Sequence, residues 1–457
     1  AALHASGLSM PTKRVTVNLA PADLPKEGSH YDLPIAVGLM AAIGAIPIDA
    51  IQSYLVLGEL SLDGSITAVA GVLPAAIGAN REDKGLICPY ACGPEAAWAG
   101  ANVDILAPRS LIALANHFRG TQVLTPPDPS MRVSSEMLPD LADIKGQETA
   151  KRALEIAAAG NHNLLLVGPP GSGKSMLAQR LPSILPRLSP RELLDVSMIA
   201  SIAGELSGGK LSDRRPFRAP HHSASMAAMV GGGLRAKPGE VSLAHNGVLF
   251  LDEFPEFSPQ VLDSLRQPLE TGECLIARVN HRTSYPARFQ LIAAMNPSPT
   301  GHYQGNHNRC SPEQTLRYLG RLSGPFLDRF DISLEIPLLP PGLLSQPQHK
   351  SECSALVRER VTRAQALQYH RQNKLNARLD NSEMRECCSL IQEDAHWLEE
   401  TLMQLGLSIR AWQRLLKVAR TIADLEEQEK IHRTHLQEAL GYRAIDRLLI
   451  HLQKMMG

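Results

Sequence analysis

The chain has 457 residues, of which 44% are hydrophobic and 20% are charged, a composition typical of a folded protein with roughly two to four domains. Its 46 basic residues balance 46 acidic ones, which excludes a uniformly basic coat for nucleic acid but not a local basic patch. Seven cysteines form no disulfide framework, and no apolar run is long enough to span a membrane. We therefore expect a cytoplasmic protein with reduced thiols and no membrane partner.

The first part of the chain alternates strand-like and helix-like segments. Residues 1–8 resemble the end of a helix and the chain does not begin with Met, so we expect that a preceding segment is missing. Alternating β-branched residues predict a strand over Arg14–Leu19, and small apolar residues predict a helix over Asp32–Ile43. Leu55–Leu60 is expected to form another strand, which a turn at Asp63-Gly64 follows.

Short apolar strands and helices alternate in the middle of the chain. The strands are Asn163–Val167, Gly247–Phe250 and Phe289–Ala294, and the first helix is Lys151–Ala159. Such runs are typical of strands buried on both faces of a parallel sheet, so the sequence predicts an α/β fold. After about residue 350 the helical periodicity and the near absence of strand signals predict a helical bundle.

Two proline-rich stretches set the expected domain boundaries. They predict a first domain over residues 1–121, a linker over 122–142, the α/β domain over 143–340 and the helical domain over 350–457.

A glycine-rich loop matches G-x-x-x-x-G-K-[ST] in full, between the apolar strand Asn163–Val167 and the helical Met176–Leu181. In this context backbone N–H groups and the helix N-terminus bind phosphate. We expect Lys174 to hold the β- and γ-phosphates of ATP, and Ser175 to ligate Mg²⁺. The predicted nucleotide-binding loop comprises Gly168, Pro169, Pro170, Gly171, Ser172, Gly173, Lys174 and Ser175.

Polar side chains end the next two strands. In VLFLDE, Asp252 and Glu253 follow an apolar strand, and ligands bind at the carboxyl edge of such sheets. We expect Asp252 to hold Mg²⁺ through water, and Glu253 to orient and deprotonate the attacking water. Asn296 follows the strand Phe289–Ala294 and is predicted to sense the γ-phosphate or position the water, with a turn cap before Pro297 as the alternative.

Two arginines could complete the site. Arg329, in SGPFLDRFD, cannot easily reach the nucleotide of its own subunit, so we predict that it acts on a neighbouring subunit in a ring, with Arg321 as its rival. Arg410 lies on a helix of the C-terminal bundle and is predicted to report the nucleotide state through that bundle. A structural ion pair remains the alternative for the first two, and a solvated helix charge for Arg410.

These motifs, with LFLDEF and AAMNPSP, resemble the magnesium-chelatase-like AAA+ proteins, and among them the bacterial ComM/YifB group. Residues 14–32 (RVTVNLAPADLPKEGSHYD) and 216–233 (PFRAPHHSASMAAMVGGG) are highly specific to that group, and the resemblance covers essentially the whole chain. It implies an AAA+ core with an insertion around Leu206–Val230 and a hairpin around Leu275–Ala287, followed by a helical lid.

The resemblance also implies an assembly and a choice of functions. Proteins of this kind form hexameric rings, and ComM-type members are similar to DNA helicases that drive branch migration in recombination and natural transformation. Chelatase subunits use the same ATPase to insert a metal into a porphyrin. Two hypotheses follow: translocation on DNA, or remodelling of a partner protein. The polarity of movement, the preferred DNA structure and the loading partner stay open.

The segment 274–289 (CLIARVNHRTSYPARF) favours DNA, because it is expected to form two strands around a basic tip. A basic hairpin in the pore of a ring would bind phosphates without reading sequence. We therefore predict DNA contacts from Arg278, His281 and Arg282, with an ordinary solvated hairpin as the alternative.

Two further features stay open or negative. His221 and His222 could line the pore, and a packing or capping role is equally compatible with the sequence. Ser298 and Thr300 stand where related proteins often carry cysteines, so we predict no structural metal.

The first domain resembles the α+β fold of the Lon protease domain, which uses a Ser–Lys dyad. In Lys26–Asp32, His30 falls where the serine belongs and Ser29 is adjacent. The lysine should fall near Leu73, where none is present. Without a neighbouring base a serine hydroxyl is a poor nucleophile, so we predict that this domain is not a peptidase.

Overall fold

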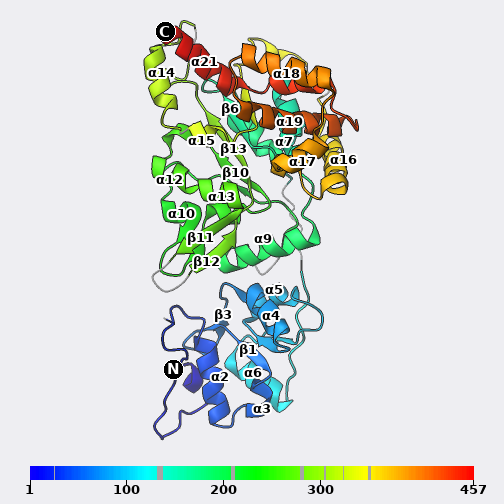
Figure 1. The fold of residues 1–457 in the computed structure, drawn as a ribbon. Helices are drawn as coiled ribbons and strands as arrows, with labels where there is room; N and C mark the ends of the chain where they lie inside the picture. Colours follow the sequence, from blue (N-terminus) through cyan, green and yellow to red (C-terminus); the bar gives the residue numbers. More distant parts are fainter. Residues whose placement is uncertain are drawn as a thin grey trace. The chain divides into compact units, whose positions relative to one another are not determined.

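The computed structural model describes residues 1–24, 26–130, 137–206, 211–277, 282–302, 305–322, 324–347 and 351–457 (Figure 1). The chain divides into two compact units. The first comprises Ala1–Ser135, Ser189–Asp213 and Gly232–Pro238, and the second Glu136–Leu188, Arg214–Gly231 and Gly239–Gly457. Among the described residues, no helix has the length and apolar character needed to cross a membrane.

The first unit is built on a small parallel sheet of order β1-β4-β5, formed by Tyr54–Val56, Gly85–Ile87 and Ile105–Leu106. Between β1 and β4 in the sequence, β2 (Glu59–Leu60) and β3 (Ile66–Thr67) form an antiparallel pair. The helices of this unit are α1 (Ala2–Ala5), α2 (Asp32–Ala42), α3 (Ile48–Ile51), α4 (Val72–Arg81), α5 (Gly93–Ala97), α6 (Leu111–Arg119) and α9 (Pro190–Ala203).

Three local predictions for this unit meet different outcomes. The helix expected over Asp32–Ile43 is confirmed as α2. The strand expected over Leu55–Leu60 is two strands, β1 and β2, because the chain breaks at Gly58, where an added Cβ would lie 2.9 Å from the Leu33 side chain. The strand expected over Arg14–Leu19 is wrong: these residues have the alternating pattern but no ladder partner among the described residues, and their side chains are exposed.

Helix α9 packs on α4 within the first unit. The backbone N–H of Gly71 donates to the carbonyl oxygen of Ser201 at 2.8 Å. The carboxylate of Glu95 accepts from the Ser201 hydroxyl and, at 3.0 Å, from the N–H of Leu73. Glu95 is 4% exposed, so these bonds satisfy a buried acid.

The second unit contains a five-stranded parallel sheet of order β14-β6-β13-β10-β7. Its strands are Ile332–Glu335, Leu164–Val167, Gln290–Met295, Val248–Leu251 and Phe217–Arg218. The parallel sheet and the three expected apolar strands are therefore confirmed. The helices that belong to this sheet region are α7 (Glu148–Gly160), α8 (Lys174–Ile184), α10 (Met226–Val230), α11 (Glu240–Leu243), α12 (Pro259–Ser264), α13 (Arg266–Thr271), α14 (Pro312–Leu319) and α15 (Gly324–Leu327).

Successive strand residues point to opposite faces of this sheet, so each strand serves two apolar cores. Leu164 and Leu166 pack with α7, α8, α16 and α19, whereas Leu165 and Val167 pack with Phe254 and the helices α12 and α15. Figure 1 shows these two sets of helices on opposite sides of the sheet. Burial on both faces explains why the strands are apolar throughout.

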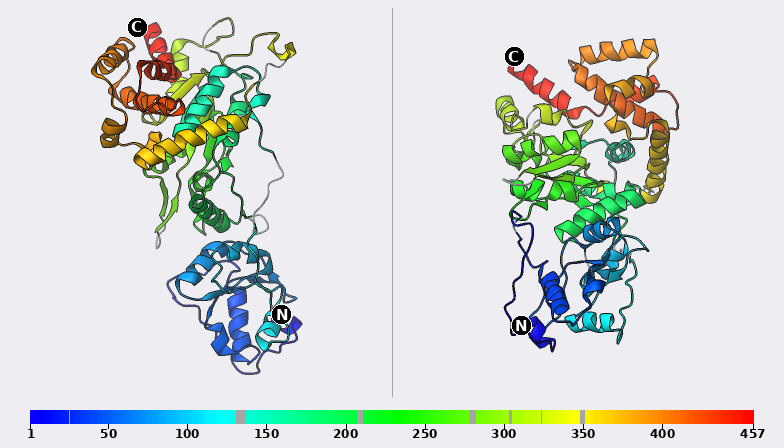
Figure 2. Two further views of the ribbon diagram at one scale, coloured as in Figure 1. Left: turned by 90° about the vertical axis from the view of Figure 1, so that its right-hand side faces the viewer. Right: turned by 60° about the horizontal axis from the view of Figure 1, so that its bottom comes forward.

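The C-terminal region is helical, as predicted. It comprises α16 (Ser354–Gln372), α17 (Asn381–Cys387), α18 (Gln392–Gln404), α19 (Ile409–Leu425), α20 (Arg433–Leu440) and α21 (Ala444–Met456). Helices α16 and α19 both pack against α7, and Figure 2 shows α16 alongside it. Helix α21 packs against α14 and β14, so the bundle contacts the sheet domain at two places.

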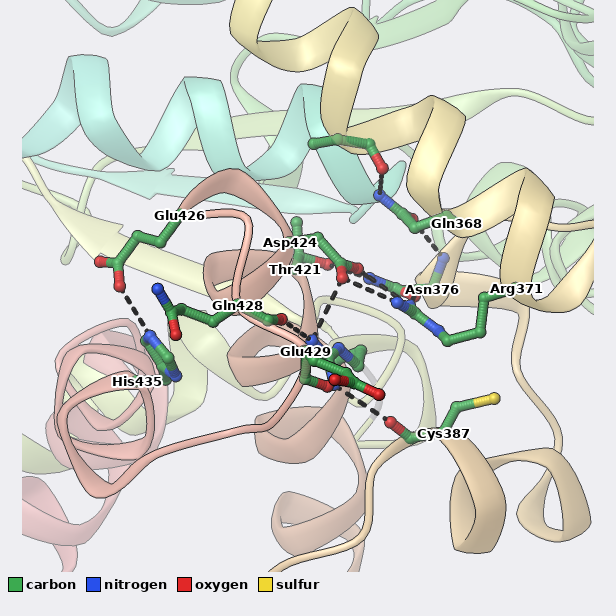
Figure 3. A network of polar contacts seen from close by, with 12 residues as sticks. Gln368, Arg371, Asn376, Cys387, Thr421, Asp424, Glu426, Gln428, Glu429 and His435 are labelled. Carbon is green, nitrogen blue, oxygen red and sulfur yellow. Dashed lines mark hydrogen bonds and ion pairs between the residues drawn. The ribbon is translucent and has the colours of Figure 1, made fainter.

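A buried polar network lies within the bundle (Figure 3), and His162 extends it to the sheet domain. Asp424 on α19 accepts from Arg371 at 2.8 Å and from Asn376 at 2.9 Å, and Asn376 also donates to the Thr421 hydroxyl at 3.0 Å. His162, at the end of α7, contacts Thr421 Oγ1 at 2.6 Å and Asp331 Oδ2 at 2.7 Å. The network therefore links the residue before β14 to the middle of the bundle.

Candidate nucleotide-binding site

Three adjacent strands deliver the predicted ATP-site residues to one edge of the sheet. The glycine-rich loop follows β6, Asp252 and Glu253 follow β10, and Asn296 follows β13, which lies between the other two. Parallel strands end at the same edge, so these side chains meet there. Asp252, Glu253 and Asn296 line a cavity of about 540 Å³. The glycine-rich loop contributes Gly171, Gly173, Lys174 and Ser175 to the same cavity.

The loop conformation needs its glycines. Gly171 and Gly173 have φ angles of 77° and 89°, which residues with a Cβ rarely adopt. A Cβ on Gly168 would lie 2.4 Å from the carbonyl oxygen of Ile336. Gly173 is the N-cap of α8, so the loop presents the amino end of that helix to the cavity. An anion is stabilised at such a helix end.

Lys174 is almost fully buried, at 9% exposed, and its ammonium group is held by backbone carbonyls. Its Nζ donates to the carbonyls of Gly168 at 2.6 Å and Pro169 at 2.9 Å, and lies 3.3 Å from Asn296 Oδ1. Burial lowers the pKa of Lys174, while the charge of Asp252 acts in the opposite direction. A desolvated cation with only neutral contacts within hydrogen-bond distance is well placed to bind phosphate oxygens.

Ser175 and Asp252 form the pair expected of a Mg²⁺ site. Ser175 Oγ donates to Asp252 Oδ2 at 2.8 Å, and both line the cavity. A hydroxyl and a carboxylate are hard oxygen donors, the type that Mg²⁺ prefers, usually with phosphate and water completing its shell. The donor set therefore fits Mg²⁺ bound together with a nucleotide.

Glu253 occupies a strained backbone position beside this pair. Its φ angle is 51°, in the left-handed region, and its backbone N–H donates to Asp252 Oδ1 at 2.9 Å. Its carboxylate is 63% exposed and faces the cavity, so it can reach water there. Residues held in such conformations cluster at functional sites.

Among the residues that line the cavity but that the sequence did not assign to it, three carry polar side chains: His222, Glu256 and Tyr318. The imidazole Nδ1 of His222 lies 3.4 Å from Glu253 Oε2. Burial raises the pKa of Tyr318 to about 12, and the charge of Glu256 adds to this effect. His222 belongs to the family-specific segment 216–233, but that segment did not assign it to the ATP site, and β7, which precedes it, is only two residues long.

The predicted arginines lie elsewhere in the same unit. Arg329 makes an ion pair with Glu270, and Arg410 contacts Asp328 Oδ2 at 3.0 Å, a carboxylate it shares with Arg414. Neither Arg329 nor Arg410 lines the cavity. The guanidinium of Arg321 lies 6.0 Å from the ring centroid of Tyr318, which does line it.

The predicted hairpin is present as β11 (Glu273–Ala277) paired antiparallel with β12 (Arg282–Pro286). Arg282 is exposed and pairs with Ala277 at the last described position. Arg278 and His281 lie outside the described residues. Two further short strands, β8 (Gly231–Gly232) and β9 (Lys237–Pro238), follow α10 in the chain.

The serine considered for peptidase chemistry contacts an acid. Ser29 Oγ donates to Glu59 Oε2 at 2.5 Å, and His30 Nε2 lies 2.8 Å from the carbonyl oxygen of Ala70. The N–H of Leu73, where a dyad lysine would fall, bonds to Glu95. Among the described residues, no group of three or more His, Cys, Asp and Glu side chains could hold a metal ion.

Comparison with known proteins matches most of the chain. Residues 140–343 match the model of magnesium chelatase, subunit ChlI, residues 351–443 match its C-terminal model, and residues 1–91 match the model of subunit ChlI of Mg-chelatase. The chain is 56% identical to the uncharacterized protein YifB of Escherichia coli, over 99% of this chain and 89% of that protein. It is 50% identical to the competence protein ComM of Haemophilus influenzae, over 99% and 90%. It is 27% identical to the magnesium-chelatase 38 kDa subunit of Rhodobacter capsulatus, over 42% and 54%.

Proposed function

The chain belongs to the ComM/YifB-type family of magnesium-chelatase-like proteins, and from this premise we propose that it is a ring-forming ATPase that couples ATP hydrolysis to movement along DNA. The observation that carries the ATPase part is the convergence of Lys174, the Ser175–Asp252 pair and Glu253 on one cavity. A phosphate-binding loop, a Mg²⁺ pair and a general base are the parts that phosphoryl transfer to water requires.

Each residue has a distinct role in the proposed reaction. Lys174 and the loop N–H groups bind the β- and γ-phosphates, and Ser175 and Asp252 hold Mg²⁺, which when bound neutralises phosphate charge. Glu253 orients a water molecule and accepts its proton as the water attacks the γ-phosphorus, while the bond from that phosphorus to the bridging oxygen breaks and ADP leaves with that oxygen. Asn296, whose Oδ1 lies 3.3 Å from Lys174 Nζ, positions the γ-phosphate or the water.

The positions of the arginines support assembly into a ring. Arg329 lies outside the cavity of its own subunit and is held by Glu270 on the chain's own surface. In a ring, such as the hexamer that the resemblance implies, Arg329 would reach the γ-phosphate bound by the next copy. Arg410, which contacts Asp328 beside it, would move with the helical region as the nucleotide state changes.

DNA is the proposed substrate because the sequence between the strands β11 and β12, together with Arg282, is basic and because a relative of 50% identity carries the name competence protein. Arg282, with Arg278 and His281, would bind the phosphate backbone without sequence preference. The role that fits is helicase or branch-migration activity in recombination or natural transformation.

The test compares ATP turnover alone, with single-stranded DNA and with forked DNA. We expect DNA to stimulate turnover, and the stimulation to fall steeply as salt rises, because phosphate contacts release counterions. An Arg282→Ala variant should lose part of the stimulation and keep basal turnover. Absence of both stimulation and DNA binding at low salt would contradict the proposal.

A second candidate is a motor that remodels a partner protein, favoured by the match to magnesium chelatase models. Turnover stimulated by a partner protein and not by DNA would support it. The N-terminal domain, proposed here over residues 1–121 with a Lon-protease-like fold, is assigned no peptidase role because Ser29 donates to Glu59 and the sequence has no lysine near Leu73, where a dyad lysine would fall. Casein degradation that Ser29→Ala abolishes would contradict that assignment.

A further inference from the structure

His222 reaches the catalytic edge of the sheet because of strand order. Strand β7 pairs in parallel with β10, with Phe217 opposite Val248 and Arg218 opposite Leu249. The segment that follows β7 therefore leaves the sheet at the same edge as the segment that follows β10. That geometry brings His222 to Glu253, although the two residues are 31 positions apart in the sequence.

The contact between these two side chains is specific. His222 Nδ1 lies 3.4 Å from Glu253 Oε2, and both side chains line the cavity. The imidazole is 33% exposed, whereas the carboxylate is 63% exposed. Contacts of catalytic groups are often this long before substrate binds and shorten in the reactive complex.

The imidazole is held in place on two sides. The ring of His221 lies 4.1 Å from it between centroids, and the ring of Phe257 meets it edge to face at 6.5 Å. The loop is fixed in turn by its own side chains: His221 Nδ1 lies 2.7 Å from Ser223 Oγ, and Ser225 Oγ caps α10 by accepting from the N–H of Ala228. His222 is therefore a fixed partner for an exposed carboxylate.

We propose that His222 is a positioning residue for ATP hydrolysis: its Nδ1–H donates to Glu253 and orients the carboxylate toward the attacking water. This inference rests on the proposed function, in which Glu253 is the general base. A free glutamate side chain populates many rotamers, and fixing the reactive one in advance is worth roughly tenfold in turnover.

The experiment measures ATP turnover and nucleotide affinity for His222→Ala and His222→Asn, with His396→Ala, an exposed histidine on α18, as the control. The amide nitrogen of Asn can replace Nδ1 as a donor, so Asn should restore what Ala removes. We expect His222→Ala to lower kcat about tenfold with nucleotide affinity unchanged, since the base alone is affected. His222→Asn should stay within about threefold of the parent protein, and His396→Ala should match it.

Normal turnover of His222→Ala would overturn the inference, as would an equal loss in kcat and affinity or an Asn variant as slow as Ala. A Glu253→Gln variant, measured in parallel, distinguishes a failure of the proposed role of His222 from a failure of Glu253 as the proposed base. If Glu253→Gln is inactive and His222→Ala is normal, only the role of His222 fails. If Glu253→Gln turns over normally, the proposed base and the role of His222 fail together.

Discussion

At the scale of single residues, the candidate ATP site is a set of groups whose environments differ although they share one cavity. Lys174 is buried and bonded to carbonyls, so it is a fixed cation for phosphate. Asp252 is engaged with Ser175, whereas Glu253 is exposed to the cavity. The two neighbouring carboxylates thus have different surroundings, which suit Asp252 for metal binding and Glu253 for proton transfer.

Replacing Glu253 with Gln removes the proposed base but keeps a side chain of the same shape. We expect turnover to fall by about 10²–10⁴-fold, the usual contribution of a positioned base, with ATP binding retained. Measurement of single-turnover hydrolysis and of binding of an ATP analogue checks this. Lys174→Ala is the matched contrast, because it should lose nucleotide binding itself; a Glu253→Gln variant with normal turnover would contradict the assignment.

Glu95 gives a pH-dependent prediction in the first unit. Burial raises the pKa of its carboxyl group, although hydrogen bonds from Ser201 and Leu73 act in the opposite direction. With the folded pKa raised, its contribution to stability is complete below the ordinary value of about 4.3 and is lost as pH rises through the raised value. Glu95→Gln keeps the acceptor oxygen without the charge, so the variant should gain melting temperature relative to the parent between pH 5 and pH 8.

Calorimetry at both pH values measures the melting-temperature difference between the variant and the parent protein. The control is Glu82→Gln, which changes an exposed carboxylate near Lys84. For this control the melting-temperature difference should be the same at both pH values. If the melting-temperature difference between Glu95→Gln and the parent protein does not change with pH, the raised pKa of the buried Glu95 carboxyl group is contradicted.

At the scale of elements, the last turn of α7 shows how the sheet domain and the helical region are joined. Three glutamine amides donate to successive carbonyls of that turn at 2.9 Å each: Gln290 to Ala157, Gln365 to Ala158 and Gln368 to Ala159. The last carbonyls of a helix have no partner within it, so these bonds help to satisfy the buried end of α7, where the carbonyl of Ala157 also accepts from the N–H of His162 at 3.0 Å. One glutamine comes from β13 and two from α16, which fixes both elements to α7.

The His162 contact extends this joint and can be tested. His162 is fully buried between Asp331 and Thr421. Burial raises the pKa of Asp331, but the hydrogen bond and charge of His162, together with the charges of Lys417 and Arg414, outweigh burial and lower that pKa. His162→Ala leaves the Asp331 carboxylate without this partner, so we expect a loss of about 3 kcal/mol in the free energy of unfolding. Chemical denaturation measures it.

The control for that loss is His396→Ala, whose side chain is 72% exposed beside Glu400 and should cost less than about 0.5 kcal/mol. Equal and small losses in both variants would show that the buried network does not stabilise the joint.

At the scale of the whole molecule, the proposed ring makes one subunit depend on the next. Arg329 lies away from its own cavity, so its proposed target is the nucleotide of a neighbour. Arg329→Ala should bind ATP normally and lose on the order of 10³-fold or more in turnover, as for arginine fingers elsewhere. Glu270→Gln removes the Arg329 ion pair without removing the arginine, and it should retain most activity.

Mixing Arg329→Ala subunits with Glu253→Gln subunits tests action between subunits. Each variant alone is inactive, but a site formed by Glu253 of one and Arg329 of the other is complete. Random mixing should therefore restore on the order of a quarter of the parent turnover, because half of the sites keep the base and half of those meet an intact arginine. A mixture as inactive as its components would contradict the trans geometry.

The sequence by itself determined the parts that depend on neighbouring residues. The loop Gly168–Ser175 and the carboxylates after Leu251 could be predicted because phosphate and Mg²⁺ chemistry needs fixed residue types at fixed local spacing. The apolar strands around them were predictable because burial on both faces leaves a continuous apolar run. The same local logic failed at Arg14–Leu19, where the alternating pattern was present but a ladder partner was not.

Only the tertiary structure decided which distant residues meet. Strand order brought His222 to Glu253, helix packing brought Ser201 to Glu95, and the joint at α7 brought Thr421 to His162. None of these pairs has a spacing that marks it in the sequence. Side-chain contacts across a fold depend on the order in which strands pair and on how helices pack on them, and the interactions that set that order are spread over the whole core.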